Sequence, residues 1–158
     1  AAMAVRDLPA GSRIRVDAYG RAHSEEWAGA ARAEAATNPR FRWHGEIAHG
    51  RLRDVYRRSH LLALTSRMEG GANVVSEAVM ADLPVLASRI PGSVGLLGED
   101  YAGYYPAEDT RALRELLLRA ETDARFYAGL ETAGRSLRPL FSEQAETSGW
   151  AELLAELT

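Results

Sequence analysis

Short apolar runs alternate along the chain with longer stretches in which apolar residues recur at helical spacing. The runs have the length of strands, and each longer stretch has room for one helix. This alternation favours an α/β fold in which a parallel sheet carries helices on both faces. We expect strands at 14–20, 61–66, 84–88 and 104–105, another strand that ends at 44–45, a helical turn at 93–97, and helices at 25–37, 51–59, 74–82, 110–121, 123–137 and 142–157.

The segment 66–78 follows an expected strand and carries Glu69 and Glu77 on either side of the pair Gly70–Gly71. The glycines therefore stand between a strand and the N-terminus of a helix. Free backbone N–H groups and the positive end of the helix dipole attract a phosphate there, and the missing side chains let the backbone approach it closely. A carboxylate accepts two hydrogen bonds at once and so suits the neighbouring hydroxyls of a sugar. The segment predicts a nucleotide-sugar site.

If only the spacing of the two glutamates is considered, an ordinary structural role explains them as well. Glu69 would favour the helix dipole as any acid near a first turn does, and Glu77 would be a surface residue of the helix. We expect that helix to end at 82, because Pro84 pushes the residue before it out of the α region. The neighbouring segments favour the ligand-binding role.

The chain resembles the C-terminal, donor-binding half of the retaining GT-B glycosyltransferases of family four, also called group 1. That family has a glutamate, seven residues and a second glutamate, followed by alanine and a strand that begins at a proline. Here the pattern runs from Glu69 to Glu77 and Ala78, and then to the strand at 83–88. The resemblance covers most of the chain and implies a Rossmann-like parallel sheet with helices on both faces, one half of a GT-B fold. The other matching segments are 41–47, 52–59, 91–95 and 103–106.

The resemblance implies a role for each residue of the motif. Glu77 would hold the ribose hydroxyls of the nucleotide, and Glu69, the expected catalytic residue, would contact the donor sugar. Asn73 would cap the helix or form a hydrogen bond with the donor. The backbone amides that approach the sugar and the diphosphate would be those of Gly70, Gly71 and Ala72.

Two further side chains are candidates for donor binding. Arg67, or Arg89 in a later loop, could reach a phosphate, although a surface arginine more often solvates a loop. His44 precedes Gly45 at the end of a strand, where open α/β sheets bind ligands, and could touch the base or a phosphate. A lone histidine is more often structural than a ligand.

A narrower resemblance lies in the segments 67–78 and 88–101, which look like the selenosugar synthases of selenoneine biosynthesis. That branch implies UDP-N-acetylglucosamine as donor and selenophosphate as acceptor. Two positions depart from the wider family. Gly71–Ala72 stand where an aromatic or small residue and then glycine are usual, and Gly95 stands where a glutamate is common, which removes one expected polar contact.

The length of 158 residues suits one domain but not the two facing domains of a GT-B enzyme. We therefore expect 1–158 to be one C-terminal domain of a longer enzyme that transfers a sugar from a nucleotide sugar, with a UDP-sugar as first choice. A small-molecule or glycan acceptor would bind to the missing N-terminal domain, so 1–158 alone would be inactive. The strand at 14–20 corresponds to the family's second strand, and the basic residues that neutralise the diphosphate precede it.

The composition of the chain argues against several kinds of binding partner. The net charge is −3 and acids are interspersed among the arginines, so no nucleic-acid surface is expected. Cysteine is absent and the four histidines show no metal-ligand spacing, so no metal is expected, and the nucleotide sugar is a co-substrate rather than a cofactor. No apolar run reaches the roughly 20 residues of a membrane span, and no signal peptide is visible. These features favour a cytoplasmic domain.

Two alternatives stay open. A nucleotide-sugar epimerase of the same architecture would need no acceptor. A non-catalytic α/β binding module would use the glycine turn only as a tight connection and would bind no nucleotide.

Overall fold

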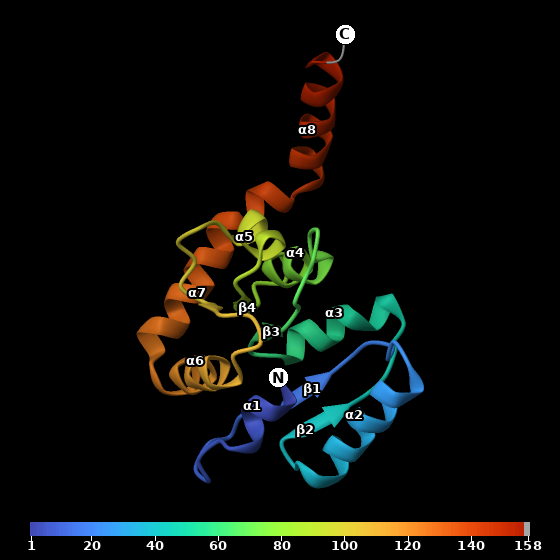
Figure 1. Cartoon of the computed structure of the whole chain (residues 1–158). Coiled ribbons are helices and arrows are strands. Elements are labelled where there is room, and N and C mark those ends of the chain that lie inside the picture. The colour runs from blue at the N-terminus through green and yellow to red at the C-terminus, as the bar shows by residue number, and fades with distance from the viewer. Residues whose placement is uncertain (157–158) are drawn as a thin grey trace.

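Strands and helices alternate along the chain, as the sequence predicts (Figure 1). The structure is a computed structural model that describes residues 1–156, except for the side chains at positions 49, 143 and 156. The strands are β1 (Val16–Ala18), β2 (Phe41–Trp43), β3 (Leu62–Leu64), β4 (Val85–Ser88) and β5 (Tyr104–Tyr105). The helices are α1 (Ala2–Arg6), α2 (Glu25–Thr37), α3 (His49–Arg58), α4 (Asn73–Met80), α5 (Pro91–Leu97), α6 (Thr110–Thr122), α7 (Ala124–Leu137), the 3₁₀ helix η1 (Arg138–Phe141) and α8 (Glu143–Glu156).

The described strands form two parallel sheets. β1 pairs with β2 in one sheet, and β3, β4 and β5 lie in that order in the other. The parallel α/β architecture is confirmed, although the sequence predicts a single sheet.

The core of the larger sheet centres on β4, in which all four residues are buried. Leu86 and Ala87 have no exposed surface at all. A strand that is apolar on both faces needs helices on both faces to exclude water from it. Helices α4, α6 and α7 supply the buried side chains of Val75, Ala78, Val79, Leu113, Leu117 and Leu130.

Two buried tyrosines connect the strands of this sheet through their hydroxyl groups. Tyr105 in β5 donates to the carbonyl oxygen of Leu64 in β3 at 2.8 Å, and Tyr101 donates to the carbonyl oxygen of Val85 in β4 at 2.6 Å. Burial raises the pKa of Tyr101 to about 12 and also raises the pKa of Tyr105, so both hydroxyls remain donors. A Cβ at Gly103 would lie 2.5 Å from the same carbonyl oxygen of Val85, so the chain needs a glycine there.

The end of α4 corrects the sequence prediction. The helix ends two residues earlier than expected, and Pro84 is not the cause. The amide of Leu83 donates to the carbonyl oxygen of Ala78 at 2.9 Å, and the amide of Asp82 donates to that of Val79 at 3.1 Å. This pair of bonds is a Schellman motif, which requires a residue in the left-handed region. Asp82 supplies it with a φ of 57°.

The short helix α1 has no counterpart in the sequence prediction. It is five residues long, which is too short to show a helical repeat of apolar residues, and it has no side-chain cap that would mark its start in the sequence. Ala4 and Val5 are nevertheless fully buried. Arg114 of α6 donates to the carbonyl oxygen of Ala4 at 3.1 Å and forms an ion pair with Asp7 at 2.5 Å. Since α1 packs against both α6 and β2, it connects the two sheets.

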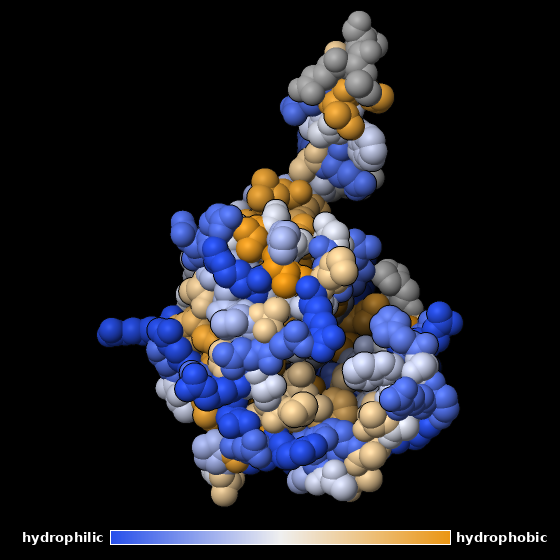
Figure 2. All heavy atoms as spheres, in the orientation of Figure 1, coloured by the Kyte–Doolittle hydropathy of each residue, from blue (hydrophilic) through white to orange (hydrophobic). Residues whose placement is uncertain are grey.

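Helix α8 projects from the rest of the chain (Figure 1), and Figure 2 shows apolar side chains on it. Trp150 is 59% exposed, and Leu153 and Leu154 are exposed as well. The predicted helix at 142–157 is confirmed as far as 156, and 157 lies outside the described residues. Within residues 1–156, every helix is too short or too polar to cross a membrane.

Burial of β4 predicts a stability difference between two chemically identical substitutions. Leu86→Ala removes a fully buried side chain and should lower the free energy of unfolding by about 2–5 kcal/mol. Leu140→Ala removes a side chain that is 66% exposed and should change it by less than about 0.5 kcal/mol. Urea unfolding of both variants measures the difference, and equal effects would contradict the described core.

Candidate functional site

The segment between β3 and α4 begins at the carboxyl edge of the larger sheet. Ser66 follows β3, and Ser88 ends β4. The buried hydroxyl of Ser88 donates to the carbonyl oxygen of Ser66 at 2.6 Å. Parallel strands end at the same edge of a sheet, where α/β folds bind their ligands. The segment with the two glutamates therefore starts from a fixed point at this edge.

Glu69 lies exposed in this segment, and two contacts fix its position. The hydroxyl of Ser66 donates to Glu69 Oε1 at 2.8 Å. Gly92, at the start of α5, packs directly against the Glu69 backbone, because a Cβ at Gly92 would overlap the carbonyl oxygen and lie 2.8 Å from the carbonyl carbon. In the sequence, Gly92 belongs to the segment 91–95 that resembles the family, but the pattern alone does not reveal this contact.

Gly70 and Gly71 are exposed, and the chain itself does not demand glycine at either position. Neither has a φ in the left-handed region, and a Cβ at either position would have no neighbour within 4 Å. The space beside both residues is therefore open to a ligand. This geometry allows the close backbone approach that the sequence predicts.

The N-terminus of α4 corrects one of the two roles predicted for Asn73, that of the helix cap. The N-cap is Ala72, which is buried and has no side-chain oxygen, and Asn73 is the first helical residue. The amide of Val75 donates to the carbonyl oxygen of Ala72 at 2.8 Å. The first turn contains no acid, and no side chain caps it. Such an end offers backbone N–H groups and a partial positive charge to an anion.

Glu77 lies on the second turn of α4 and is partly buried. Tyr56 of α3, itself only 7% exposed, donates its hydroxyl to Glu77 Oε2 at 2.8 Å. Burial, and then the Glu77 carboxylate, raise the pKa of Tyr56, so its hydroxyl remains protonated. Glu77 is therefore oriented by a neighbouring helix, which an ordinary surface glutamate is not.

The two candidate arginines are both paired. Arg67 forms an exposed ion pair at 2.5 Å with Glu108, which has a φ of 66°. Arg89 pairs with Glu99 at 2.6 Å, donates to the Glu99 carbonyl oxygen at 2.8 Å, and lies over the ring of Tyr104. Arg67 is the less constrained of the two, because its one ion pair is exposed to solvent.

His44 lies at the carboxyl edge of the other sheet. Its Nε2 is 2.6 Å from Asp17 Oδ1, and its ring stacks on Tyr19 with a centroid distance of 4.7 Å. A cavity of about 740 Å³ is lined by these three residues together with Ile47 and the α3 face that carries Arg51. No described hydrogen bond connects His44 to the segment 66–78, and that segment does not line the cavity of His44.

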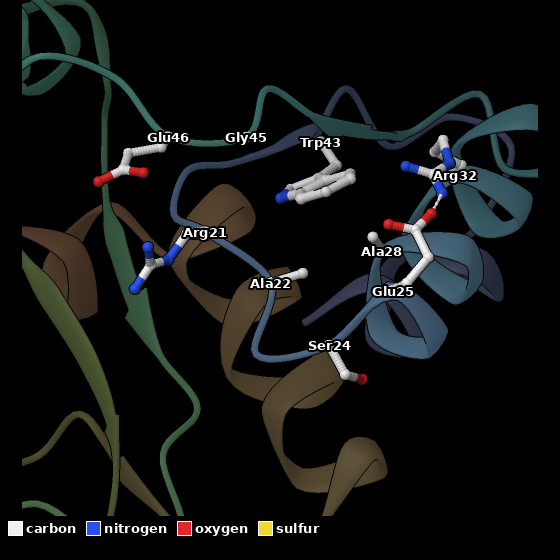
Figure 3. Close-up of a pocket in the computed structure, with 9 residues that line it drawn as sticks. All are labelled: Arg21, Ala22, Ser24, Glu25, Ala28, Arg32, Trp43, Gly45 and Glu46. Atoms are coloured by element: carbon white, nitrogen blue, oxygen red, sulfur yellow. Dashed lines mark hydrogen bonds and ion pairs between the residues drawn. The ribbon is translucent and has the colours of Figure 1, made fainter.

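Figure 3 shows a second hollow, of about 380 Å³, beyond the ends of β1 and β2. The Trp43 side chain lies beside it, and Arg32 and Glu25 of α2 form an ion pair at its edge. Arg21 also lines it, with Gly45 and Glu46 from the segment after β2. Neither hollow is lined by Glu69 or Glu77.

No group of three or more histidine, aspartate or glutamate side chains suitable for a metal ion occurs among the residues that the structure describes.

The contact between Gly92 and Glu69 predicts opposite effects at two glycines of α5. Gly92→Ala must push the Glu69 backbone away and should lower the free energy of unfolding by about 1–3 kcal/mol. Gly95→Ala adds a Cβ in open space within the helix and should be neutral or stabilise by up to about 1 kcal/mol. Urea unfolding of both variants tests this, and a Gly92→Ala variant as stable as Gly95→Ala would contradict the contact.

Comparisons with known proteins extend this description. The family model of glycosyl transferases group 1 matches residues 2–137. The comparison with curated proteins gave no match. Anabaena HepE, solved in complex with UDP, superposes with a TM-score of 0.84 at 17% identity, and the match covers 98% of this chain and 44% of HepE.

Two further solved structures have the same fold. Sucrose-phosphate synthase from Thermosynechococcus elongatus matches with a TM-score of 0.70 at 23% identity, over 89% of this chain and 37% of that protein. The pneumococcal O-GlcNAc transferase GtfA, solved with UDP and GlcNAc, matches with a TM-score of 0.70 at 15% identity, over 90% of this chain and 29% of GtfA. The chain thus spans less than half the length of each. Because the family model covers most of the chain, this protein belongs to the glycosyl transferases group 1 family, and its parallel α/β fold is that of one half of a GT-B glycosyltransferase.

Proposed function

We propose that this domain binds the nucleotide-sugar donor of a glycosyltransferase, and that the donor is a UDP-sugar. Membership of the group 1 family supports the reaction class. The choice of UDP is supported by HepE, which was solved with UDP and with UDP-glucose, and by GtfA, which was solved with UDP and GlcNAc. The acceptor, a small molecule or a glycan, is bound by a second domain that faces this one.

One arrangement carries the proposal: two oriented glutamates on either side of an uncapped helix N-terminus. Glu69 is fixed by Ser66 and Gly92, and Glu77 is fixed by Tyr56. Between them, Gly70–Gly71 leave open space beside the backbone. A ligand that suits all three features has a hydroxyl-rich part at each end and an anionic part in the middle. A nucleotide sugar has this composition, with ribose, diphosphate and sugar in succession.

In the proposed complex, Glu77 accepts hydrogen bonds from the ribose hydroxyls, and Glu69 contacts the donor sugar. The backbone amides of Gly70, Gly71, Ala72 and Asn73 approach the diphosphate. As the bond between the sugar and the diphosphate breaks, negative charge grows on the diphosphate, and these amides and the helix dipole stabilise it. This is electrostatic stabilisation rather than covalent catalysis, and it requires no metal ion.

Two basic groups complete the proposed donor site. Arg67 exchanges its exposed partner Glu108 for a donor phosphate, which costs little because an exposed ion pair is weak. His44, at the carboxyl edge of the other sheet, contacts the base or a phosphate from the cavity that it shares with Tyr19.

We also propose that the sugar keeps its configuration, as in the family four enzymes. For the donor sugar and acceptor, we propose those of the selenosugar synthase branch, N-acetylglucosamine and selenophosphate, on the likeness of the segments 67–78 and 88–101.

Removal of the Glu77 carboxylate tests the donor site directly. Calorimetric titration of the chain with UDP, UDP-N-acetylglucosamine, GDP and ADP should show the tightest binding for the uridine nucleotides. Glu77→Ala should weaken UDP binding by roughly 1.5–3 kcal/mol, the contribution of a hydrogen bond to a charged group. Glu26→Ala, which removes an exposed glutamate of α2, should leave the affinity unchanged. Absence of nucleotide binding at millimolar concentration would instead favour a non-catalytic module.

Dependence on an acceptor separates a transferase from an epimerase. In the full-length protein, release of UDP from a UDP-sugar should rise at least about tenfold when an acceptor is added, because transfer needs both substrates. Chromatography of the sugar products measures this. Conversion of one UDP-sugar into its epimer without an acceptor would contradict the proposed transfer reaction.

A further inference from the structure

Tyr56 and Glu77 belong to different helices and lie 21 positions apart in the chain, yet their side chains meet at 2.8 Å. Among the described residues, this is the one hydrogen bond that joins α3 to α4. The ring of Tyr56 belongs to the hydrophobic core, whereas Glu77 is partly exposed. The bond therefore connects the rigid interior of the domain to a side chain at its surface.

A buried tyrosine hydroxyl needs an acceptor, and a neutral carbonyl oxygen is the usual one in this protein. Tyr105 and Tyr101 donate to the carbonyl oxygens of Leu64 and Val85. Tyr56 differs because its acceptor is the carboxylate oxygen Glu77 Oε2. A hydrogen bond to an ionised acceptor is shorter and stronger than one between neutral groups. Tyr56 therefore holds one oxygen of the Glu77 carboxylate in place.

The bond leaves Glu77 with capacity for a ligand. Each carboxylate oxygen accepts two hydrogen bonds. In the described structure, Oε1 accepts none, and Oε2 accepts the one from Tyr56. A pair of neighbouring hydroxyls can therefore reach both oxygens of a carboxylate whose torsions are already set. Such a carboxylate loses less conformational freedom on binding than a free glutamate does.

We propose that Tyr56 is a positioning residue for the donor site, which orients the Glu77 carboxylate toward the ribose hydroxyls of the nucleotide. This inference rests on the proposed function, because it needs Glu77 to contact the donor. Tyr56 itself does not touch the nucleotide, so its effect appears only with ligands that carry the hydroxyls to which Glu77 binds.

The test compares Tyr56→Phe with wild type for two ligands, UDP and 2′,3′-dideoxy-UDP, by calorimetric titration of the full chain. Tyr56→Phe keeps the buried ring and removes only the hydroxyl. Its affinity for UDP should fall about two- to tenfold, the effect of one hydrogen bond. Its affinity for dideoxy-UDP should not change. The preference for UDP over dideoxy-UDP should therefore decrease, which a purely structural role of Tyr56 would not cause.

Tyr127→Phe is the matched control. It removes a hydroxyl that donates to the His60 carbonyl oxygen at 2.7 Å, and neither residue belongs to the donor motif. It should leave the preference for UDP at the wild-type value. Circular dichroism and urea unfolding accompany each titration.

A double variant tests whether Tyr56 acts through Glu77. Tyr56→Phe combined with Glu77→Ala should bind UDP as well as Glu77→Ala alone, because the hydroxyl no longer has a carboxylate to orient. Additive losses would overturn the inference. The inference would also be overturned if Glu77→Ala abolished the preference for UDP over dideoxy-UDP and Tyr56→Phe left it unchanged. In that case the proposed function would stand. Failure of wild type to bind UDP would overturn both.

Discussion

Burial of β4 between two parallel neighbours is the constraint on which the rest of the site depends. A strand covered on both faces cannot shift along its neighbours without exposing apolar side chains or breaking its ladder of hydrogen bonds. Its pairing with β3 fixes where both strands end, and the hydroxyl of Ser88 then donates to the carbonyl oxygen of Ser66. Tyr105 reaches from β5 to Leu64 at the end of β3. The segment with Glu69 thus leaves the sheet from a position that three strands define together.

The same constraint explains how acidic side chains and a proposed phosphate site coexist. A carboxylate repels a nearby phosphate, and this repulsion weakens as the distance between the two charges grows. Glu69 forms a hydrogen bond with Ser66 before the helix begins. Glu77 lies about one helical turn after the start of α4 and forms a hydrogen bond with Tyr56. The uncapped amides at the start of α4 lie between them. The two carboxylates and the positive end of the helix are thereby separated along the segment 69–77, and this separation is what a ligand with an anionic centre and neutral, hydroxyl-rich ends requires.

Much of this architecture could be predicted from the sequence, where the local signal was strong. The strand at 84–88 and the helix at 110–121 agree with β4 and α6 within one residue, because a short apolar run and apolar residues at helical spacing are local features. The missed features depend on residues far apart in the chain. Gly92 is needed because Glu69 lies against it, and Tyr56 is an apolar residue of α3 until α4 brings Glu77 to it. The order of the strands and their division into two sheets likewise depend on long-range pairing, which a periodic pattern does not encode.

Helix α3 connects the two halves of the proposed donor site. Arg51, Val55 and Arg58 recur at helical spacing and line the cavity that holds His44. Leu52 and Tyr56 lie four residues apart on a different face, where Leu52 packs against the core and Tyr56 meets Glu77. Figure 1 shows α3 running between the two sheets. Both faces belong to one rigid helix. A tilt of α3 that changes the shape of the cavity therefore also moves the Tyr56 hydroxyl that contacts Glu77. Helix α3 therefore contacts Glu77 through Tyr56 on one face and lines the cavity of His44 with another.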